Sequence, residues 1–411
     1  MNQTTPPTSL LAATAVETDA TASACPCCGS TRTQTIYRVA GVPVHSCVLL
    51  GSEDEAKAFP RRDLQIAFCD ACGFLFNEIF DASAMSYAGD FEESQHFSDT
   101  FNAFARGLAG EIAQRCDVRG KEVLEIGCGK GEFLRELCRV GGATGVGVDP
   151  GYRADPGRGG DESVRFVVDY YRPERDFGGD VVLCRHTLEH IGPTREFVQA
   201  IRAGCEGRPD AEVVFETPDV RRVLEEGAFW DMYYEHCSYF SAGTHARLFR
   251  ALGFDVHALA VEYGGQYIVQ YARPAAGPTA PRLPLEDDLE AMRALARDYP
   301  ARVAAVQDYW RNLVLSAVAG GRRVALWGGG SKAVSFLTTL GLADEISAVV
   351  DVNPYKQGRF MPGAGRRVGA PSELASNPPD VVIVMNPIYV PEITAALEAM
   401  GLRPSVVAVG A

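Results

Sequence analysis

The sequence predicts an α/β protein with two units built on parallel sheets and a small cysteine-bearing module in front of them. Three observations support this prediction. A strand–glycine–helix–strand pattern begins at Lys121, a second one begins at Arg323, and paired cysteines precede both. Strands that alternate with helices are typical of βαβ units and a parallel sheet. The length of 411 residues fits two or three domains at roughly 150 residues each.

The order of segments predicts five parts. Residues 1–23 are biased to Thr, Ala, Ser and Pro and predict a disordered tail. Residues 24–80 form the cysteine module, residues 81–273 the first α/β unit and residues 285–411 the second. A Pro-rich segment, 274–284, predicts the linker between the two units.

Within the first unit, the predicted helices and strands are 101–116, 123–126, 132–140, 145–148, 165–168, 180–184, 212–216 and 254–261. Within the second unit they are a long helix, 285–318, and strands 323–327, 346–351 and 380–385. Each glycine loop lies directly after the first predicted strand of its unit, which is where a βαβ unit binds ligands.

The composition excludes several classes of protein. Hydrophobic residues make up 46% and charged residues 22% of the chain, as in a globular protein with a core. The net charge of −14 disfavours binding to nucleic acid or to an anionic membrane. No apolar run approaches the ~20 residues of a transmembrane helix, and residues 1–24 lack the pattern of a secretory signal. We therefore expect a cytoplasmic protein with reduced, buried or metal-bound cysteines.

Two C-x2-C-G pairs predict a zinc site. Cys25 and Cys28 form one pair, and Cys69 and Cys72 form the other. Each pair places two thiolates on one tight turn, and two turns complete a tetrahedral shell of four sulfurs that suits Zn2+. A shell of four thiolates leaves no open position, so the predicted zinc is structural. The alternative ligands in the same segment are Cys27, His45 and Cys47.

The first glycine loop, 127–131, reads Gly-Cys-Gly-Lys-Gly and follows Glu125 and an apolar strand. Glycines let a ligand approach the backbone, and the helix that follows offers free N–H groups. Asp149 ends the next strand, where a carboxylate can accept both hydroxyls of a ribose. The glycines alone also fit a dinucleotide, but the G-x-G-x-G spacing and the preceding Glu argue against one. The pattern E-x-G-x-G-x-G resembles the S-adenosylmethionine (SAM) loop of class I methyltransferases.

That resemblance implies a SAM site. It implies that Glu125 orders the loop and its contacts to the methionine part of SAM, and that Asp149 binds the ribose. Asp169 and Tyr170, after a third strand, resemble the adenine-side residues, and His186 begins a segment that resembles the one under the methyl donor. The implied SAM-binding residues are Glu125, Gly127, Cys128, Gly129, Gly131, Asp149, Asp169, Tyr170 and His186.

The run from Trp230 to Ser241 offers a phenol, a carboxylate and an imidazole within four residues: Tyr233, Glu235 and His236. An imidazole with a pKa near 6.5 can accept a proton at neutral pH, and an adjacent carboxylate or phenol can orient it. A histidine among aromatic residues is also often structural, so the run alone leaves both roles open.

From about Ala24 onward, the chain resembles the sugar C-methyltransferases of deoxysugar biosynthesis. The resemblance rests on the four-cysteine module, the SAM loop and a Y-x-E-H stretch followed by F-S, which here begins at Tyr233 and ends at Ser241. A glycine–Ser–Lys loop, 328–332, and a D-x-N-P-x-K-x-G stretch, 351–358, extend it to the second unit. It implies a class I methyltransferase Rossmann-like domain between an N-terminal zinc-binding module and a C-terminal Rossmann-like domain.

The resemblance further implies methylation of carbon on a nucleotide-linked ketosugar. The proton next to the ketone is removed, and the enolate attacks the methyl sulfonium of SAM. In this scheme His236 is the general base, Glu235 its partner or an anchor for a sugar hydroxyl, and Tyr233 an oxyanion or sugar contact. Tyr87 corresponds to a further tyrosine of the family.

Departures from the family pattern leave the acceptor open. Tyr234 stands where the family often has Asp, and His186 stands near the position of a common Asn. Cys237 and Ser238 replace aromatic residues after the predicted base. His186 is therefore a second base candidate, beside its interpretation as a structural histidine under SAM.

The second glycine loop, 328–330, together with Asp351 after the next strand, imitates a nucleotide site. Lysine and arginine near it predict that this unit holds the diphosphate or nucleotide of the substrate. The alternative is a scaffold that only covers the active site. The predicted substrate-binding residues are Lys332, Asn353, Lys356 and Arg359.

The function predicted is therefore SAM-dependent C-methylation of a small molecule, a nucleotide-linked ketosugar. An O- or N-methyltransferase on the same scaffold is the alternative. A non-enzymatic zinc protein is disfavoured by the intact Glu125, Asp149 and Glu235-His236. A nicotinamide oxidoreductase is disfavoured by the spacing of the first loop, while the second loop leaves it open.

Overall fold

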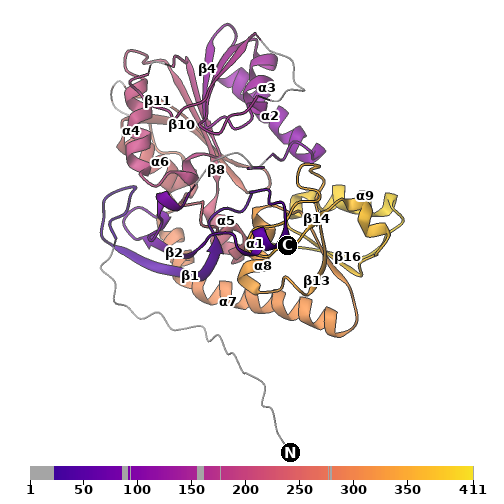
Figure 1. Cartoon of the computed structure of the whole chain (residues 1–411). Coiled ribbons are helices and arrows are strands. Elements are labelled where there is room, and N and C mark those ends of the chain that lie inside the picture. Colours follow the sequence, from indigo (N-terminus) through magenta and orange to yellow (C-terminus); the bar gives the residue numbers. More distant parts are fainter. Residues whose placement is uncertain are drawn as a thin grey trace, which may run out of the picture.

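Three β-sheets organise the chain, and their arrangement is visible in Figure 1. The structure, a computed structural model, describes residues 23–85, 91–92, 94–154, 162–175, 177–275, 277 and 280–410. The predicted tail lies outside this range except for Ser23. The α/β class with parallel sheets and an N-terminal four-cysteine module is confirmed.

The first sheet has four strands in the order β1-β2-β3-β9. They are β1 (Thr33–Pro43), β2 (Arg61–Cys69), β3 (Leu75–Asn77) and β9 (Ser238–Tyr239), accompanied by α1 (Glu53–Lys57) and the 3-10 turn η1 (Ala82–Ala84). Strand β9 comes from the predicted catalytic run and pairs Tyr239 with Leu75. The cysteine module therefore shares a sheet with the segment that follows His236.

The second sheet has seven strands in the order β10-β11-β8-β7-β4-β5-β6, and only β11 runs antiparallel to its neighbours. The strands are β4 (Glu122–Ile126), β5 (Thr144–Val148), β6 (Val164–Val167), β7 (Val181–Arg185), β8 (Glu212–Pro218), β10 (Phe254–Glu262) and β11 (Tyr267–Pro274). All five residues of β7 are buried, as expected for a central strand covered on both faces.

Helices cover both faces of this sheet (Figure 1). Helices α2 (Asp99–Arg115) and α3 (Glu132–Gly141) share one core with it, and α4 (Thr194–Gly204) and α6 (Ala242–Ala251) share the other. The remaining turns of helix are η2 (Leu188–His190), α5 (Val220–Glu226) and η3 (Phe229–Asp231).

The third sheet is parallel, with the order β14-β13-β12-β15-β16. Its strands are β12 (Val324–Trp327), β13 (Ile346–Val350), β14 (Val368–Gly369), β15 (Val381–Val384) and β16 (Ser405–Ala408). The helices of this unit are η4 (Pro284–Glu286), α7 (Leu289–Ala319), α8 (Ser331–Leu340), η5 (Pro371–Ala375), η6 (Pro387–Tyr389) and α9 (Val390–Ala399).

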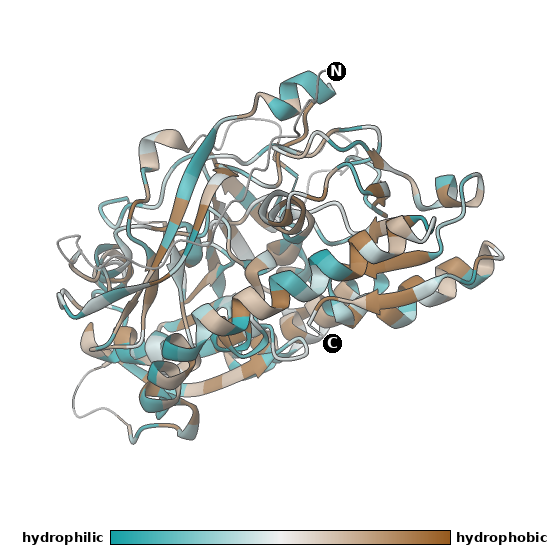
Figure 2. Cartoon of the chain, turned by 90° about the horizontal axis from the view of Figure 1, so that it is seen from below, coloured by the Kyte–Doolittle hydropathy of each residue, from teal (hydrophilic) through white to brown (hydrophobic). Residues whose placement is uncertain are grey.

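Helix α7 ties the cysteine module to the C-terminal unit. It begins four residues later than the predicted long helix, because Pro284 starts a separate 3-10 turn. Tyr299 packs on Tyr37 of β1 with ring centroids 5.9 Å apart, and Trp310 packs on Phe336 of α8 at 5.6 Å. Figure 2 shows this helix carrying both hydrophilic and hydrophobic residues along its length, as expected for a helix with one buried face.

Both glycine loops follow the carboxyl end of a central strand, β4 or β12. Residues of both loops line the same cavity. Ligands of parallel α/β sheets bind at the carboxyl ends of the strands. In this fold the carboxyl ends of β4 and β12 therefore face the same cavity. Among the described residues, no helix combines the length and the apolar character needed to cross a bilayer; the cytoplasmic location stays a prediction.

Candidate active site

A cavity of about 470 Å³ lies between the three parts of the chain. Cys47 of the cysteine module, Gly127 of the first glycine loop and Lys332 of the C-terminal unit all line it. Its volume is within the range of sites for small ligands, roughly 300–1,000 Å³. The cavity therefore has walls from every unit that the sequence singled out.

The first glycine loop has the backbone that its sequence predicts. Gly127, Gly129 and Gly131 have φ angles of 72°, 52° and 73°, a region that favours glycine. A Cβ on Gly127 would lie 2.0 Å from Oγ1 of Thr187. The loop is thus held against the segment that follows β7, and only glycine fits there.

Glu125 ends up at the base of this loop with its side chain buried. Burial raises the pKa of Glu125 to about 8, although the charge of Arg185 opposes this. One of its carboxylate oxygens has no hydrogen-bond partner among the described residues. A buried acceptor without a partner costs free energy, and it is available to a donor brought by a ligand.

Asp149 and Asp351 occupy equivalent positions in the two α/β units. Asp149 accepts hydrogen bonds from the backbone N–H groups of Gly129 at 2.9 Å and Gly151 at 2.7 Å. Asp351 accepts them from Gly329 at 2.7 Å and Asn353 at 2.8 Å. Each aspartate therefore braces the glycine loop of its own unit.

Several predicted SAM residues lie beside the cavity rather than in its wall. The lining residues include Glu125, Gly127, Cys128, Gly129 and His186, but not Gly131, Asp149, Asp169 or Tyr170. Tyr170 is 59% exposed, and Asp169 accepts a hydrogen bond from Arg175. The cavity as shaped here covers the methionine side of the predicted SAM site.

His236 lies half-buried in the cavity wall among aromatic rings. Its ring packs edge-on against Tyr233 at 4.6 Å and against His190 at 4.7 Å. Burial and the charge of His190 hold the pKa of His236 well below its usual value, while Asp231 opposes them. The imidazole is therefore neutral at neutral pH, which a proton acceptor requires.

His186 has the opposite electrostatic environment. Burial alone would lower the pKa of His186, but the carboxylates of Glu216 and Glu189 outweigh burial and raise the pKa to about 9. Nδ1 lies 3.4 Å from Glu189, and Nε2 lies 3.3 Å from Glu216. A histidine that is protonated at neutral pH cannot accept a proton, so the structure disfavours His186 as the second base.

Glu235 does not face His236 through its carboxylate. One carboxylate oxygen accepts a hydrogen bond from the backbone N–H of Ser46 at 2.8 Å, and the other accepts the Ser46 hydroxyl. Nδ1 of His45 lies 3.3 Å from the same carboxylate. The carboxylate of Glu235 thus bonds Ser46 and lies near His45, and these contacts tie the predicted catalytic run to the cysteine module. The predicted roles of Glu235, as partner of His236 or as anchor for a sugar hydroxyl, stay predictions.

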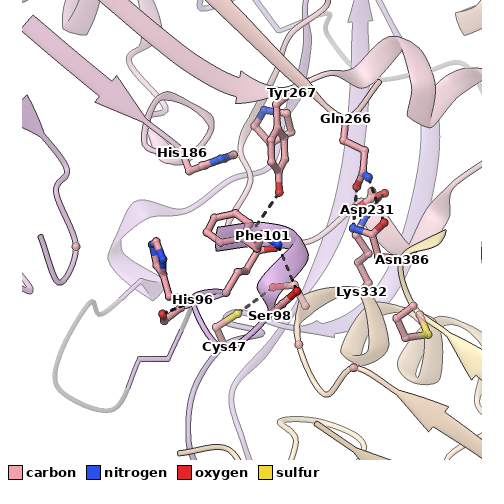
Figure 3. Close-up of a pocket in the computed structure, with 18 of the residues that line it drawn as sticks. Cys47, His96, Ser98, Phe101, His186, Asp231, Gln266, Tyr267, Lys332 and Asn386 are labelled. Carbon is pink, nitrogen blue, oxygen red and sulfur yellow. Dashed lines mark hydrogen bonds and ion pairs between the residues drawn. The ribbon is translucent and has the colours of Figure 1, made fainter. Parts of the chain in front are cut away.

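Tyr233 keeps its proton. Burial and the carboxylate of Asp231 raise the pKa of Tyr233 well above its usual value, and its hydroxyl donates to Asp231 at 3.1 Å. Asp231 also accepts Nζ of Lys332 at 2.6 Å and 2.7 Å, one bond to each oxygen. Figure 3 shows Lys332 and Asp231 together at the cavity.

The other predicted substrate residues divide into two groups. Asn353 and Lys356 line the large cavity with Lys332. Nδ2 of Asn353 donates to Glu92 at 3.0 Å, and Nζ of Lys356 lies 3.7 Å from Asp351. Arg359 is exposed and lines a separate, smaller cavity. Lys356 lines this smaller cavity as well, so Arg359 lies near Lys356 but outside the large cavity that Lys332 and Asn353 line.

The four predicted zinc ligands come together. The Sγ atoms of Cys25, Cys28, Cys69 and Cys72 all lie within 4.8 Å of one another. Sγ of Cys25 is 3.7 Å from that of Cys72, and Sγ of Cys28 is 3.6 Å from that of Cys69. A tetrahedral shell with Zn–S bonds of ~2.3 Å has S–S edges of about 3.8 Å, so these residues fit zinc.

The alternative ligands lie differently. His45 faces Glu235, and Sγ of Cys47 lies 3.0 Å from Oγ of Ser331. Cys27 is buried next to the cluster but is not among the four thiols that converge. Tyr87, the further predicted tyrosine, falls outside the described residues.

Sequence reasoning missed three contributors to the cavity. His190 lies against His236, and its Nδ1 is 3.0 Å from the backbone oxygen of Glu235. Gln266 and Asn386 exchange two amide hydrogen bonds, at 3.1 Å and 2.9 Å, and join the second and third sheets (Figure 3). His190 could have been found from the spacing of His186-Thr-Leu-Glu-His190, whereas the amide pair leaves no signal in the sequence.

Two family models match this chain. One is described as a methyltransferase domain and matches residues 99–259; the other is described as a C-methyltransferase C-terminal domain and matches residues 283–404. The first range covers most of the second sheet with its helices but not β11, and the second covers the unit of the third sheet up to β16.

Individual proteins are similar as well. The C-methyltransferase NovU of Streptomyces niveus is 28% identical over 368 residues, which cover 84% of this chain and 85% of that protein. The ubiquinone biosynthesis O-methyltransferase of Salmonella paratyphi A is 33% identical over 106 residues, 24% of this chain and 43% of that protein. Among solved structures, the 1,6-didemethyltoxoflavin-N1-methyltransferase of Burkholderia thailandensis is 20% identical, covering 43% of this chain and 81% of that chain with a TM-score of 0.33.

The SAM-type glycine loop and both family matches agree on one activity, and His236 lines the same cavity as the loop. The chain carries a methyltransferase domain and a C-methyltransferase C-terminal domain, and it is a SAM-dependent methyltransferase.

Proposed function

We propose that the protein methylates the carbon next to the ketone of a nucleotide-linked ketosugar, through an enolate formed by His236. The observation that carries this proposal is the position of a neutral imidazole in a cavity shared by the SAM loop and the C-terminal lysines. A relative with a C-methyltransferase name that spans most of the chain supports transfer to carbon.

The proposed reaction begins with proton removal. His236 accepts the proton from the carbon next to the ketone, and the C–H electron pair moves into the enolate. The enolate oxygen needs a hydrogen-bond donor, and Tyr233, which keeps its proton and lines the cavity, is the proposed contact for it. SAM supplies an electrophilic methyl group, so a C–C bond forms, the S–C bond breaks and S-adenosylhomocysteine leaves.

The C-terminal unit is proposed to hold the nucleotide end of the substrate. Lys332 gives two of its three N–H bonds to Asp231, which leaves one for a phosphate oxygen. Lys356 and the amide of Asn353 line the same cavity. Arg359 is exposed and does not line this cavity, so it has no part in the proposed set.

Zinc is proposed to be structural, held by Cys25, Cys28, Cys69 and Cys72. Four thiolates close the coordination shell, so zinc would supply no open position for chemistry. Backbone and side chains hold the turns in place independently: Arg247 of α6 donates two hydrogen bonds to the carbonyl of Cys72, at 3.1 Å and 2.9 Å.

The test is a screen of nucleotide-linked ketosugars by mass spectrometry, with wild type and His236→Asn. We expect one product that gains a methylene mass, and a rate for His236→Asn lower by about 10²–10⁴-fold, the usual contribution of a general base. His257→Asn is the matched control, because His257 pairs with Glu212 at 2.9 Å and does not line the cavity. A full rate in His236→Asn contradicts the base assignment.

Deuterium exchange separates transfer to carbon from transfer to oxygen or nitrogen. In deuterated water without SAM, enolisation places deuterium on the carbon next to the ketone. O- or N-methylation predicts no such exchange with the true acceptor, and that result would replace the enolate mechanism.

A further inference from the structure

The C-terminal unit grips the segment in front of the proposed base. Ser335 of α8 donates its hydroxyl proton to the backbone oxygens of Phe229 and Met232, at 3.0 Å and 3.1 Å. The rings of Phe229 and Phe336 stack with centroids 5.8 Å apart. Helix α8 therefore holds both ends of η3, which ends five residues before His236.

Asp231, between these two anchors, accepts hydrogen bonds from three side chains, two of which come from helices. Its carboxylate accepts both short bonds from Lys332 of α8, one from Arg222 of α5 at 2.5 Å, and one from the hydroxyl of Tyr233 at 3.1 Å. Only 8% of Asp231 is exposed. Charge-assisted bonds in such a buried place fix geometry more firmly than bonds in water.

The charges of this cluster balance. Arg222 also donates to Glu226 at 2.7 Å, so two carboxylates face two cations. Burial alone would raise the pKa of Asp231, but Lys332 and Arg222 outweigh burial and hold the pKa well below its usual range. Asp231 is therefore a permanent anion, and its removal leaves buried positive charge without a partner.

From Asp231 the contacts continue to His236. The ring of Tyr233 packs edge-on against His236 at an interplanar angle of 70°. The backbone oxygen of Tyr233 accepts a hydrogen bond from Tyr239 at 3.1 Å, which fixes the other side of the residue. Tyr233 thus sits between the carboxylate of Asp231 and the imidazole.

We propose that Asp231 is a positioning residue for methyl transfer: held by Lys332 and Arg222, it fixes Tyr233 beside His236, so that the C-terminal unit contributes to the chemical step as well as to substrate binding. This inference rests on the proposed role of His236. It assigns Lys332 a part in kcat that a phosphate contact alone would not have.

The test uses three variants: Asp231→Asn, Lys332→Met and the double variant that combines these two changes. Each is compared with the control variant Glu225→Gln. Glu225 is the matched control, because it is an exposed carboxylate on α5 that pairs with Arg221 at 2.8 Å. We expect Asp231→Asn to lower kcat by at least about 10-fold with KM for SAM unchanged, since small misplacements of reacting groups are costly. Lys332→Met is expected to lower kcat too, rather than only raise KM for the sugar.

The pH profile gives a readout that a structural role would not move. Apart from Asp231, the titratable groups around His236 are Tyr233, Tyr239, His190, Glu189, His186 and Lys332. The charge of Asp231 favours the protonated imidazole, whereas that of Lys332 disfavours it. The acidic limb of kcat is therefore expected at lower pH in Asp231→Asn, and closer to wild type in the double variant.

The double variant also guards against misfolding. It leaves Arg222 paired with Glu226, so we expect its thermal midpoint to recover towards wild type while kcat stays low. Wild-type kcat and an unmoved acidic limb in a folded Asp231→Asn protein would overturn the inference. A fully active His236→Asn variant would contradict the proposed function itself. An inactive His236→Asn variant together with a fully active Asp231→Asn variant would contradict only the positioning role of Asp231.

Discussion

His236 and His186 line one cavity, but their surroundings move their pKa values in opposite directions. His236 has rings and other histidines around it, and burial lowers its pKa. His186 has Glu216 and Glu189 within ion-pair distance, and its pKa rises to about 9. A pair of titratable groups with diverging pKa values is how one site separates a proton acceptor from a permanent cation.

The raised pKa of His186 predicts a pH-dependent stability. The protonated His186 stabilises the folded protein through its two carboxylate partners. This stabilisation is complete at a pH below 6.5, the pKa of His186 in the unfolded chain, and is lost as the pH rises through about 9, its pKa in the folded protein. A rise of the pKa by this amount corresponds to a contribution of His186 to the free energy of unfolding on the order of 3 kcal/mol. Urea unfolding between pH 6 and 10 should show this decrease in wild type and a smaller one in His186→Gln. Equal slopes in the two proteins would contradict the ion-pair assignment.

At the scale of elements, each α/β unit repeats one device: a buried strand, a glycine loop, a helix, and an aspartate that braces the loop from the next strand. The sequence predicts these elements well. Strands expected at 123–126, 180–184 and 346–351 match β4, β7 and β13 within one residue at each end. Buried parallel strands are short, continuous apolar runs bounded by glycine loops, which is a strong local signal.

Gly127→Ala tests the first loop, with Gly120→Ala as its control. Both glycines have φ near +71°, so alanine at either costs about 1 kcal/mol of stability. At Gly120 the new Cβ meets nothing within 4 Å, whereas at Gly127 it clashes with Thr187. We therefore expect Gly127→Ala to lose a further 1–3 kcal/mol or so, and to bind S-adenosylhomocysteine at least about tenfold more weakly. Calorimetric titration checks the affinity; equal affinity in both variants would contradict the prediction.

Over the whole molecule, the three units meet at one cavity, and the cysteine module both lines it with Cys47 and holds the residues on either side of His236. Strand β3 pairs with β9, and the backbone N–H of Asn77 donates to the backbone oxygen of Cys237 at 3.0 Å. Ser46 holds the carboxylate of Glu235. We therefore expect a disturbance in the cysteine module to affect Glu235 and Cys237, the two residues next to His236 in the chain.

Loss of zinc is accordingly expected to lower activity as well as stability. Cys25→Ser with Cys69→Ser should lose the metal, about one zinc per chain in wild type, unfold at lower temperature and show a reduced kcat. Cys27→Ser is the control and should keep its zinc, because Cys27 is outside the converging four. Metal analysis, thermal unfolding and the methylation rate test this together; a zinc-free variant with full kcat would show that the module is dispensable for catalysis.

Local sequence determined the glycine loops, the central strands and the four cysteines, because each depends on backbone conformation, apolar runs or spacing within a few residues. Tertiary structure decided what those patterns meet. Lys332 turned out to bond Asp231, Glu235 to bond Ser46, and Arg359 to lie at another cavity. These contacts join residues 100 or more positions apart, so they depend on how the three sheets pack. The sequence around a charged side chain does not indicate which distant residue the packing will place next to it.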